Sequence, residues 1–325
     1  MNERVSTYTS PKMRDHGGGL DAATIQFGGS RSEWLDLSTG INPTSYPIPP
    51  IAKRFWQSLP DSSDQDALLR AARNFWDIPE GADVTAASGV SALIAAIPRL
   101  TAAGSVGISQ PTYNEHAASF AALGWKVLND VADTNVYVHP NNPDGRLWQQ
   151  KILRTNHKRL TIIDESFCDT DPDQSHIQLT SKPGYVVLKG LGKFWGLAGL
   201  RLGFAAAHPD TIAMINQIIG PWAISGPAQH IGRLALEDTH WAIKMRNALA
   251  ADANRLDQVM TNAGATSPCG TTLFRTFQVK NAQNWFEKLA SHHILSRVFP
   301  YSDTMIRLGI PKTPEEWSRL QKSLE

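Results

Sequence analysis

Lys193 and Arg201 stand eight residues apart in the glycine-rich stretch Lys189-Gly-Leu-Gly-Lys-Phe-Trp-Gly-Leu-Ala-Gly-Leu-Arg-Leu-Gly203. A lysine on a constrained turn can form a Schiff base with an aldehyde cofactor, and a nearby arginine can hold the phosphate of that cofactor. A lysine between glycines also occurs in solvated surface loops, so this stretch alone does not show whether Lys193 binds a cofactor. The sequence Gly-Leu-Gly-Lys is too short for a P-loop and lacks the following Ser or Thr.

Four further segments with polar or aromatic residues follow predicted strands or open a predicted helix. In open parallel sheets, ligands bind beyond the carboxyl ends of the strands. A carboxylate there is costly unless it has a partner, and backbone N–H groups at a helix start can hold a phosphate. The candidates are Asp164 after the run 160–163, Asn142 in the turn 141–145, Tyr113 after the run 106–108, and Ser88, Gly89 and Val90 before the helix that starts near residue 92.

Each of these candidates also has an ordinary structural explanation. The sequence Asn-Asn-Pro-Asp-Gly forms turns without any function, and Asp164 can cap a helix. Ser88 can belong to a normal helix start, and Tyr113 can be a half-buried ring. Taken singly, every candidate except Asp164 is better explained in this way. Together they supply a phosphate cradle, an aromatic face, an amide donor, a carboxylate and an amine, which are the needs of pyridoxal 5′-phosphate.

Composition narrows the class of protein. Charge is nearly balanced, with 31 Lys and Arg against 30 Asp and Glu, so we expect no nucleic-acid or anionic-membrane partner. The two cysteines, Cys168 and Cys269, form no disulfide framework or metal pattern, which is typical of a reducing cytoplasm. No apolar run is long enough to span a bilayer, and the first ten residues lack the apolar core of a signal peptide. We therefore expect a cytoplasmic protein.

Short apolar runs alternate with amphipathic stretches up to about residue 225, which predicts an α/β fold with a mostly parallel sheet covered on both faces. A Gly- and Pro-rich region of little regular structure precedes it, up to about residue 60. Beyond residue 226, a long helical region over 228–260 opens a smaller α+β domain. We expect strands at 106–108, 125–128, 136–138, 160–163, 185–188 and 202–206, helices at 66–76, 92–97 and 115–123, and a division into an N-terminal arm (1–45), a large domain (46–225) and a small domain (226–325).

The order of these segments resembles the fold-type-I pyridoxal-phosphate enzymes of the aminotransferase class I/II superfamily, over about residues 15–310. The patterns Lys-x-x-Gly-Leu-Ala-Gly-Leu-Arg-Leu-Gly and Asn-Asn-Pro-x-Gly are typical of the branch that contains histidinol-phosphate aminotransferase. Within it, His16-Gly-Gly18, Leu35-Asp-Leu-Ser-Thr-Gly-Ile-Asn-Pro43 and Pro111-Thr-Tyr-Asn-Glu-His116 resemble the threonine-phosphate decarboxylases of cobalamin biosynthesis. The resemblance implies a seven-stranded type of sheet, and a homodimer with sites between the domains and at the subunit boundary.

The resemblance also assigns roles to residues. Lys193 would bind pyridoxal 5′-phosphate covalently and later shuttle protons, and Asp164 would keep its pyridine nitrogen protonated. Arg307 would bind the substrate carboxylate. The remaining roles would fall to Asn142 at the phenolic oxygen, Tyr113 on the ring, Ser88, Gly89, Val90 and Arg201 at the phosphate, and Arg297, Asn42 and His16 at the polar groups of the substrate.

Three positions depart from the family pattern. Phe167 stands where many relatives have a tyrosine that donates to the phenolic oxygen. Gly190, three residues before the lysine, replaces a usual Ser or Thr that contacts the phosphate. Leu59 replaces a tyrosine that many relatives lend to the neighbouring subunit. Because the lysine, the aspartate and the arginine are present, we expect an active enzyme with altered cofactor contacts.

The implied reaction is decarboxylation of L-threonine O-3-phosphate, a phosphorylated amino acid, to (R)-1-aminopropan-2-yl phosphate and CO2 in cobalamin biosynthesis. The alternative is a histidinol-phosphate-type aminotransferase, which uses the same cofactor residues and aligns a different bond at Cα. Residue spacing does not separate the two, and the arm around His16 and Asn42 favours the decarboxylase. A third interpretation, a non-enzymatic assembly partner, has only Phe167 and Gly190 in its support.

Overall fold

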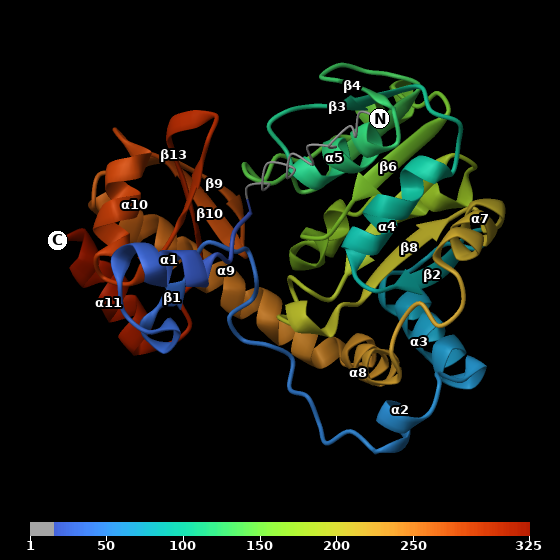
Figure 1. Ribbon diagram of the computed structural model, residues 1–325, viewed down its shortest axis with the longest axis horizontal. Coiled ribbons are helices and arrows are strands. Elements are labelled where there is room, and N and C mark those ends of the chain that lie inside the picture. The colour runs from blue at the N-terminus through green and yellow to red at the C-terminus, as the bar shows by residue number, and fades with distance from the viewer. Residues whose placement is uncertain (1–15) are drawn as a thin grey trace, which may run out of the picture.

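The computed structural model describes residues 16–325, so the first fifteen residues of the predicted arm lie outside it, including the first ten, which lack the apolar core of a signal peptide. Figure 1 shows two lobes, connected by the long helix α9 (Thr239–Asn262). Among the described residues, no helix combines the length and the apolar character that crossing a membrane requires.

The larger lobe is built on a seven-stranded sheet with the strand order β2-β8-β7-β6-β5-β3-β4. Strand β8 runs antiparallel to both of its neighbours, and the other pairs are parallel. The predicted α/β fold with a mostly parallel, seven-stranded sheet is therefore confirmed. The strands are β2 (Asp83–Ala87), β3 (Ser105–Ile108), β4 (Lys126–Leu128), β5 (Thr134–Val138), β6 (Leu160–Asp164), β7 (Tyr185–Gly190) and β8 (Gly203–Ala207).

Helices cover both faces of this sheet because successive side chains of each buried strand point to opposite faces. In β7, Val186 and Leu188 pack into one apolar cluster, and Val187 packs into the other. Burial of both clusters is the main force that holds the layers together. The first face carries α4 (Val90–Ala96), α5 (Asn114–Ala122) and α7 (Pro209–Ile219), and the second carries α3 (Ser62–Phe75), α6 (Gln150–Thr155) and α8 (Gly226–Glu237).

The smaller lobe contains an antiparallel sheet of order β12-β13-β10-β9, packed against α9 and two further helices. Helix α11 begins with a capping box, in which Thr313 and Glu316 satisfy each other's backbone N–H groups. The elements are β9 (Thr266–Thr271), β10 (Phe274–Gln278), α10 (Ala282–Ala290), β11 (Ile294–Leu295), β12 (Arg297–Phe299), β13 (Ser302–Gly309) and α11 (Pro314–Leu324).

The structure adds detail to two expectations about secondary structure. The region up to residue 60 contains regular elements, namely α1 (Leu20–Phe27), β1 (Leu35–Asp36) and α2 (Arg54–Gln57). Strand β1 pairs in parallel with β11, so tertiary pairing with the smaller lobe supplies the order that local sequence does not indicate.

The helical region over 228–260 is two helices, because Asp238 lies between α8 and α9 and its side chain accepts a hydrogen bond from the Trp241 N–H at 2.9 Å. Strand β2 was not expected, since alanines in its sequence Asp-Val-Thr-Ala-Ala give a weak strand signal.

Candidate active site

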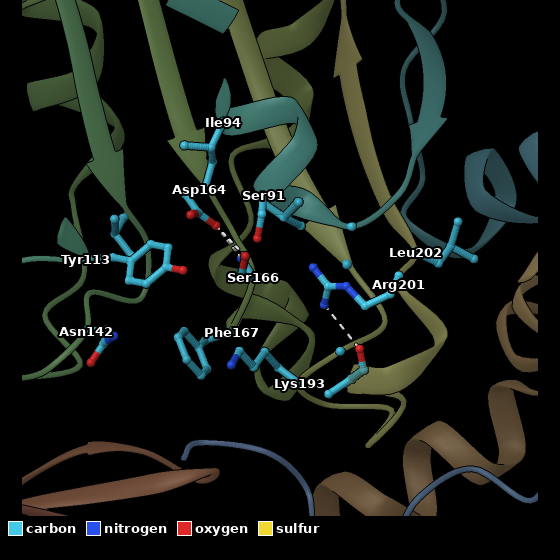
Figure 2. Close-up of a pocket in the computed structure, with 16 residues that line it drawn as sticks. Ser91, Ile94, Tyr113, Asn142, Asp164, Ser166, Phe167, Lys193, Arg201 and Leu202 are labelled. Carbon is cyan, nitrogen blue, oxygen red and sulfur yellow. Dashed lines mark hydrogen bonds between the residues drawn. The ribbon is translucent and has the colours of Figure 1, made fainter. Parts of the chain in front are cut away.

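A cavity of about 210 Å³ lies beyond the carboxyl ends of β5, β6 and β7. Parallel strands end at the same edge of a sheet, so the turns that follow them meet there. In Figure 2, Tyr113, Asp164 and Lys193 surround one open space together with Phe167 and Arg201. The expected cofactor residues that line the cavity are Gly89, Val90, Tyr113, Asn142, Asp164, Lys193 and Arg201.

Asp164 is the last residue of β6 and is almost completely buried. Its Oδ2 atom is 2.8 Å from His116 Nε2, and its Oδ1 atom accepts hydrogen bonds from the N–H (3.0 Å) and the hydroxyl (2.5 Å) of Ser166. Burial acts to raise the pKa of this carboxyl, but the hydrogen bonds and the charge of His116 outweigh it and hold the pKa below its usual range. Asp164 is therefore a carboxylate at neutral pH.

His116 and Ser166 are functional candidates that the sequence reasoning missed. His116 stands three residues after Tyr113, a spacing that places both on one side of the first turn of α5. Ser166 stands two residues after Asp164, which is typical of a hydroxyl that bonds to a local carboxylate. These two spacings were the available signals.

Lys193 lies in the turn after β7, with its amine 5.6 Å from the centre of the Phe167 ring. The side chain is half-buried and lines the cavity. This burial lowers the pKa of the amine to about 8; the positive charge of Arg307 acts in the same direction, and Asp164 opposes it. A lysine with this pKa is partly uncharged at neutral pH, as a nucleophilic amine must be.

Arg201 brings a fixed positive charge to one end of the cavity. It adopts a left-handed backbone (φ 51°), and its Nη1 donates to the Ala198 carbonyl at 3.1 Å. Gly89, also at positive φ (83°), leaves space for it, since a Cβ there would lie 2.6 Å from Arg201 Nη2. Ser91 adds a hydroxyl to the same wall. The set of one guanidinium, one hydroxyl and closely approaching backbone suits a phosphate.

Ser88, expected to contact the phosphate, does not line this cavity. Its hydroxyl donates to the carbonyl of Ala223 at 2.5 Å. The residue that does present a hydroxyl is Ser91, three positions further along. The chain turns sharply at Gly89 before α4 starts, and that turn directs the side chains of 88 and 91 to different sides.

Arg307 lies on β13 of the smaller lobe, and its guanidinium reaches Asn142 of the larger lobe. Its Nη1 donates to Asn142 Oδ1, and its Nη2 donates to the Ser38 carbonyl at 2.7 Å. Burial lowers the pKa of Arg307 to about 10, and the charge of Arg297 contributes. Arg307 is thus a buried cation that touches the cavity wall through Asn142.

The remaining substrate candidates lie apart from the cavity lining. His16 Nε2 is 2.9 Å from Glu115 Oε1 on α5, and Arg297 Nη1 donates to the His16 carbonyl at 2.7 Å. Asn42 is buried, donates from Nδ2 to the Phe194 carbonyl at 2.8 Å and accepts from the Thr44 N–H at 2.9 Å. Its amide is used to hold the turn that carries the lysine, so the structure does not place it as a substrate ligand.

The three departures from the family pattern also have structural counterparts. Phe167 lines the cavity and packs edge-on against Phe274 at 5.0 Å. A Cβ at Gly190 would lie 2.8 Å from Val90 Cγ2, so valine occupies the space that a serine side chain would need. Leu59 is 68% exposed, outside the cavity.

The sequence pattern of the family described as Aminotransferase class I and II matches residues 136–323. The threonine-phosphate decarboxylase of Pseudomonas aeruginosa is 34% identical over 96% of this chain and 97% of its own length. A threonine-phosphate decarboxylase of a Sinorhizobium species is 35% identical over 91% of this chain and 92% of its own length.

Solved structures show the same fold. A histidinol-phosphate aminotransferase from Sinorhizobium meliloti, in complex with pyridoxal-5′-phosphate, superimposes with a TM-score of 0.82 at 19% identity, over 99% of this chain and 97% of that one. L-threonine-O-3-phosphate decarboxylase from Porphyromonas gingivalis gives a TM-score of 0.74 at 18% identity, over 89% of this chain and 98% of that one. The chain belongs to the aminotransferase class I and II family and, within it, groups with the threonine-phosphate decarboxylases.

Proposed function

We propose that this protein decarboxylates L-threonine O-3-phosphate to (R)-1-aminopropan-2-yl phosphate and CO2, a step of cobalamin biosynthesis, with pyridoxal 5′-phosphate as cofactor. The observation that carries the proposal is the meeting of Lys193, Asp164 and Arg201 around one cavity. Relatives over more than nine-tenths of the chain are threonine-phosphate decarboxylases, which supports the choice of substrate.

The residues around the cavity fit pyridoxal 5′-phosphate. Arg201, Ser91 and the backbone near Gly89 suit its phosphate, and Tyr113 offers an aromatic face. Asn142 offers an amide that also lines the cavity. When bound, the cofactor supplies an electron sink that stabilises the charge left at Cα after CO2 departs.

Asp164 and Lys193 would control the two protons that the reaction requires, one on the pyridine nitrogen and one at Cα. The Asp164 carboxylate, kept ionised by His116 and Ser166, would favour a protonated pyridine nitrogen through charge attraction. The Lys193 amine would hold the cofactor at its aldehyde group in its uncharged form and would supply a proton at Cα of the substrate in its protonated form. A pKa of about 8 permits both states near neutral pH.

The substrate carries two anionic groups, and cations from outside the cavity lining would bind them. Arg307 takes the carboxylate, since a guanidinium pairs with a carboxylate through two parallel hydrogen bonds. Arg297 and His16, joined by a hydrogen bond at the edge of the arm, take the phosphate. The Asn142 contact holds the Arg307 side chain in place.

Incubation of the purified protein with L-threonine O-3-phosphate, with and without 2-oxoglutarate, tests this function. CO2 release that needs no acceptor supports the decarboxylase. Glutamate formation that depends on both compounds would contradict it and support the histidinol-phosphate-type aminotransferase instead. The Lys193→Ala variant is the control, because it retains the fold-forming residues and lacks the amine.

We also propose that the protein forms a homodimer in the cytoplasm. Each subunit would consist of an arm (1–45), a large domain (46–225) and a small domain (226–325). Three large apolar side chains support a subunit contact, since Trp56, Leu59 and Trp222 are 66%, 68% and 59% exposed. Light scattering coupled to size-exclusion chromatography tests the dimer. A mass twice that of the 35.7 kDa chain supports it, and a monomer mass contradicts it.

A further inference from the structure

A buried ionic cluster lies behind the strand ends that carry the candidate active site. Glu165, next to Asp164, and Lys189 on β7 are both at most 2% exposed, and Asp169 is 3% exposed. Lys189 Nζ is 2.6 Å from Glu165 Oε2 and 3.6 Å from Asp169 Oδ1. Asp169 does not line the cavity, and the proposed reaction does not use it. A buried carboxylate needs several partners, and these partners indicate what Asp169 holds.

Two indole N–H groups are the further partners of Asp169. Trp76 Nε1 donates to Oδ1 at 2.9 Å, and Trp195 Nε1 donates to Oδ2 at 3.2 Å. Both rings lie in the same apolar core, and both bonds have a charged acceptor, which makes them stronger than neutral hydrogen bonds. The two tryptophans differ in their place in the chain: Trp76 directly follows α3, whereas Trp195 stands two residues after Lys193.

The turn that carries Lys193 is held from two sides. On one side, the Asn42 amide donates to the Phe194 carbonyl at 2.8 Å, and the Tyr46 N–H donates to the Trp195 carbonyl at 2.9 Å. On the other side, the Trp195 indole reaches Asp169. The turn therefore lies between the segment 42–46 and the buried ionic cluster, and Trp195 belongs to both contacts.

We propose that Asp169 is a positioning residue for Lys193, acting through the indole N–H of Trp195. This bond fixes the turn so that the amine stays against the cavity wall, shielded from bulk water. The proposal rests on the proposed role of Lys193 as the group that binds the cofactor, and it does not depend on which substrate is used.

Loss of the hydrogen bond between Trp195 and Asp169 is expected to change the pKa of the Lys193 amine. The charged groups that face this amine are Arg307, Arg201 and Asp164, and none of them contacts Trp195 through a hydrogen bond in residues 16–325. Burial is the largest influence on the pKa of the amine, which is about 8. A loosened turn admits water to the amine, so its pKa rises toward the ordinary value of a lysine.

The two tryptophans provide a matched pair of variants. Trp195→Phe and Trp76→Phe each remove one indole N–H from Asp169 and each retain an aromatic ring in the core. The pKa of the Lys193 amine is measured in the full-length protein before cofactor is added, from the pH dependence of its modification by trinitrobenzenesulfonate. The same measurement on Lys193→Ala gives the reaction of the other lysines, which is then subtracted. Circular dichroism and thermal melts report the fold and stability of each variant.

We expect Trp195→Phe to raise the amine pKa by about one unit, which leaves about tenfold less free amine at pH 7. Trp76→Phe is expected to leave the amine pKa unchanged although it lowers the melting temperature to a similar extent. Asp169→Leu, which removes both acceptor oxygens, carries the same test as Trp195→Phe and applies if the latter does not fold. Equal shifts in both tryptophan variants, or no shift in Trp195→Phe and Asp169→Leu, would overturn the proposal. A wild-type protein that releases no CO2 would contradict the proposed function but leave this measurement valid.

Discussion

His116 Nε2 lies 2.8 Å from Asp164 Oδ2, and both side chains are almost completely buried. The histidine comes from α5, on one face of the sheet, and the aspartate ends β6. The second carboxylate oxygen is bonded to Ser166. Each oxygen of Asp164 thus has its own donor, and the carboxylate is fixed in position and charge before any cofactor binds.

Replacing His116 tests whether this fixed charge serves the cofactor. His116→Phe removes the donor, so burial raises the pKa of Asp164 and weakens its attraction for a protonated pyridine nitrogen. We expect the dissociation constant of pyridoxal 5′-phosphate, measured by absorbance titration, to rise about 10- to 150-fold, since a hydrogen bond to a charged group is worth roughly 1.5–3 kcal/mol. His116→Gln keeps a donor and is expected to bind like the wild type. Equal affinities for the two variants would assign His116 to packing alone.

The Lys193 amine is expected to make the free energy of unfolding rise with pH. Its folded-state pKa of about 8 is below the ordinary lysine value of 10.5, so between these values the unfolded chain binds more protons and stability rises with pH. Below about pH 8 the buried charge costs up to about 3 kcal/mol. Lys193→Met is therefore expected to be more stable than the wild type at pH 7, by an amount that shrinks as the pH approaches 10.5.

Urea unfolding of the cofactor-free protein from pH 6 to 10 measures this difference. Lys189→Met is the control, because that lysine is paired with Glu165 at 2.6 Å. Removing one partner of a buried ion pair costs about 3–5 kcal/mol, so the control is expected to be destabilised at pH 7. Destabilisation of Lys193→Met at pH 7 would contradict the prediction.

The effects of substitutions at Gly190 and Val90 are expected to be coupled. Gly190→Ser alone brings a Cβ to 2.8 Å from Val90 Cγ2, so we expect lower stability, by about 1–3 kcal/mol, and weaker cofactor binding. The double variant Gly190→Ser/Val90→Ala removes the clash and adds a hydroxyl to the wall of the cavity that Arg201 also lines. It is expected to bind pyridoxal 5′-phosphate at least as tightly as the wild type, by absorbance titration. If the double variant binds no better than Gly190→Ser alone, the clash is not the cause.

Arg307→Lys tests recognition of the substrate carboxylate. A lysine cannot reproduce the planar fork of a guanidinium, so KM for L-threonine O-3-phosphate is expected to rise about 10- to 100-fold. Arg275→Lys is the matched control: its guanidinium forms two 2.8 Å hydrogen bonds to Asp257, which is not a cavity residue, whereas Arg307 contacts the cavity residue Asn142. The prediction fails if KM is unchanged in Arg307→Lys, or if both variants raise it equally.

The sequence by itself determined the fold class, the cofactor class and the order of the main site residues. Apolar runs such as 160–163 and 185–188 are read directly from the chain, and the confirmed sheet contains both. Asp164 and Lys193 follow those runs immediately, so their place at the sheet edge depends only on local spacing. The family patterns added the relationship to threonine-phosphate decarboxylases, which the comparisons confirm.

Only the tertiary structure decided which neighbouring side chains enter the cavity and which support it. Ser91 rather than Ser88 faces the cavity because of the turn at Gly89, and Asn42 bonds to a carbonyl 152 residues away. His116 meets Asp164 across 48 residues. Contacts of this kind depend on how helices and loops far apart in the chain pack together, and no local periodicity records that packing.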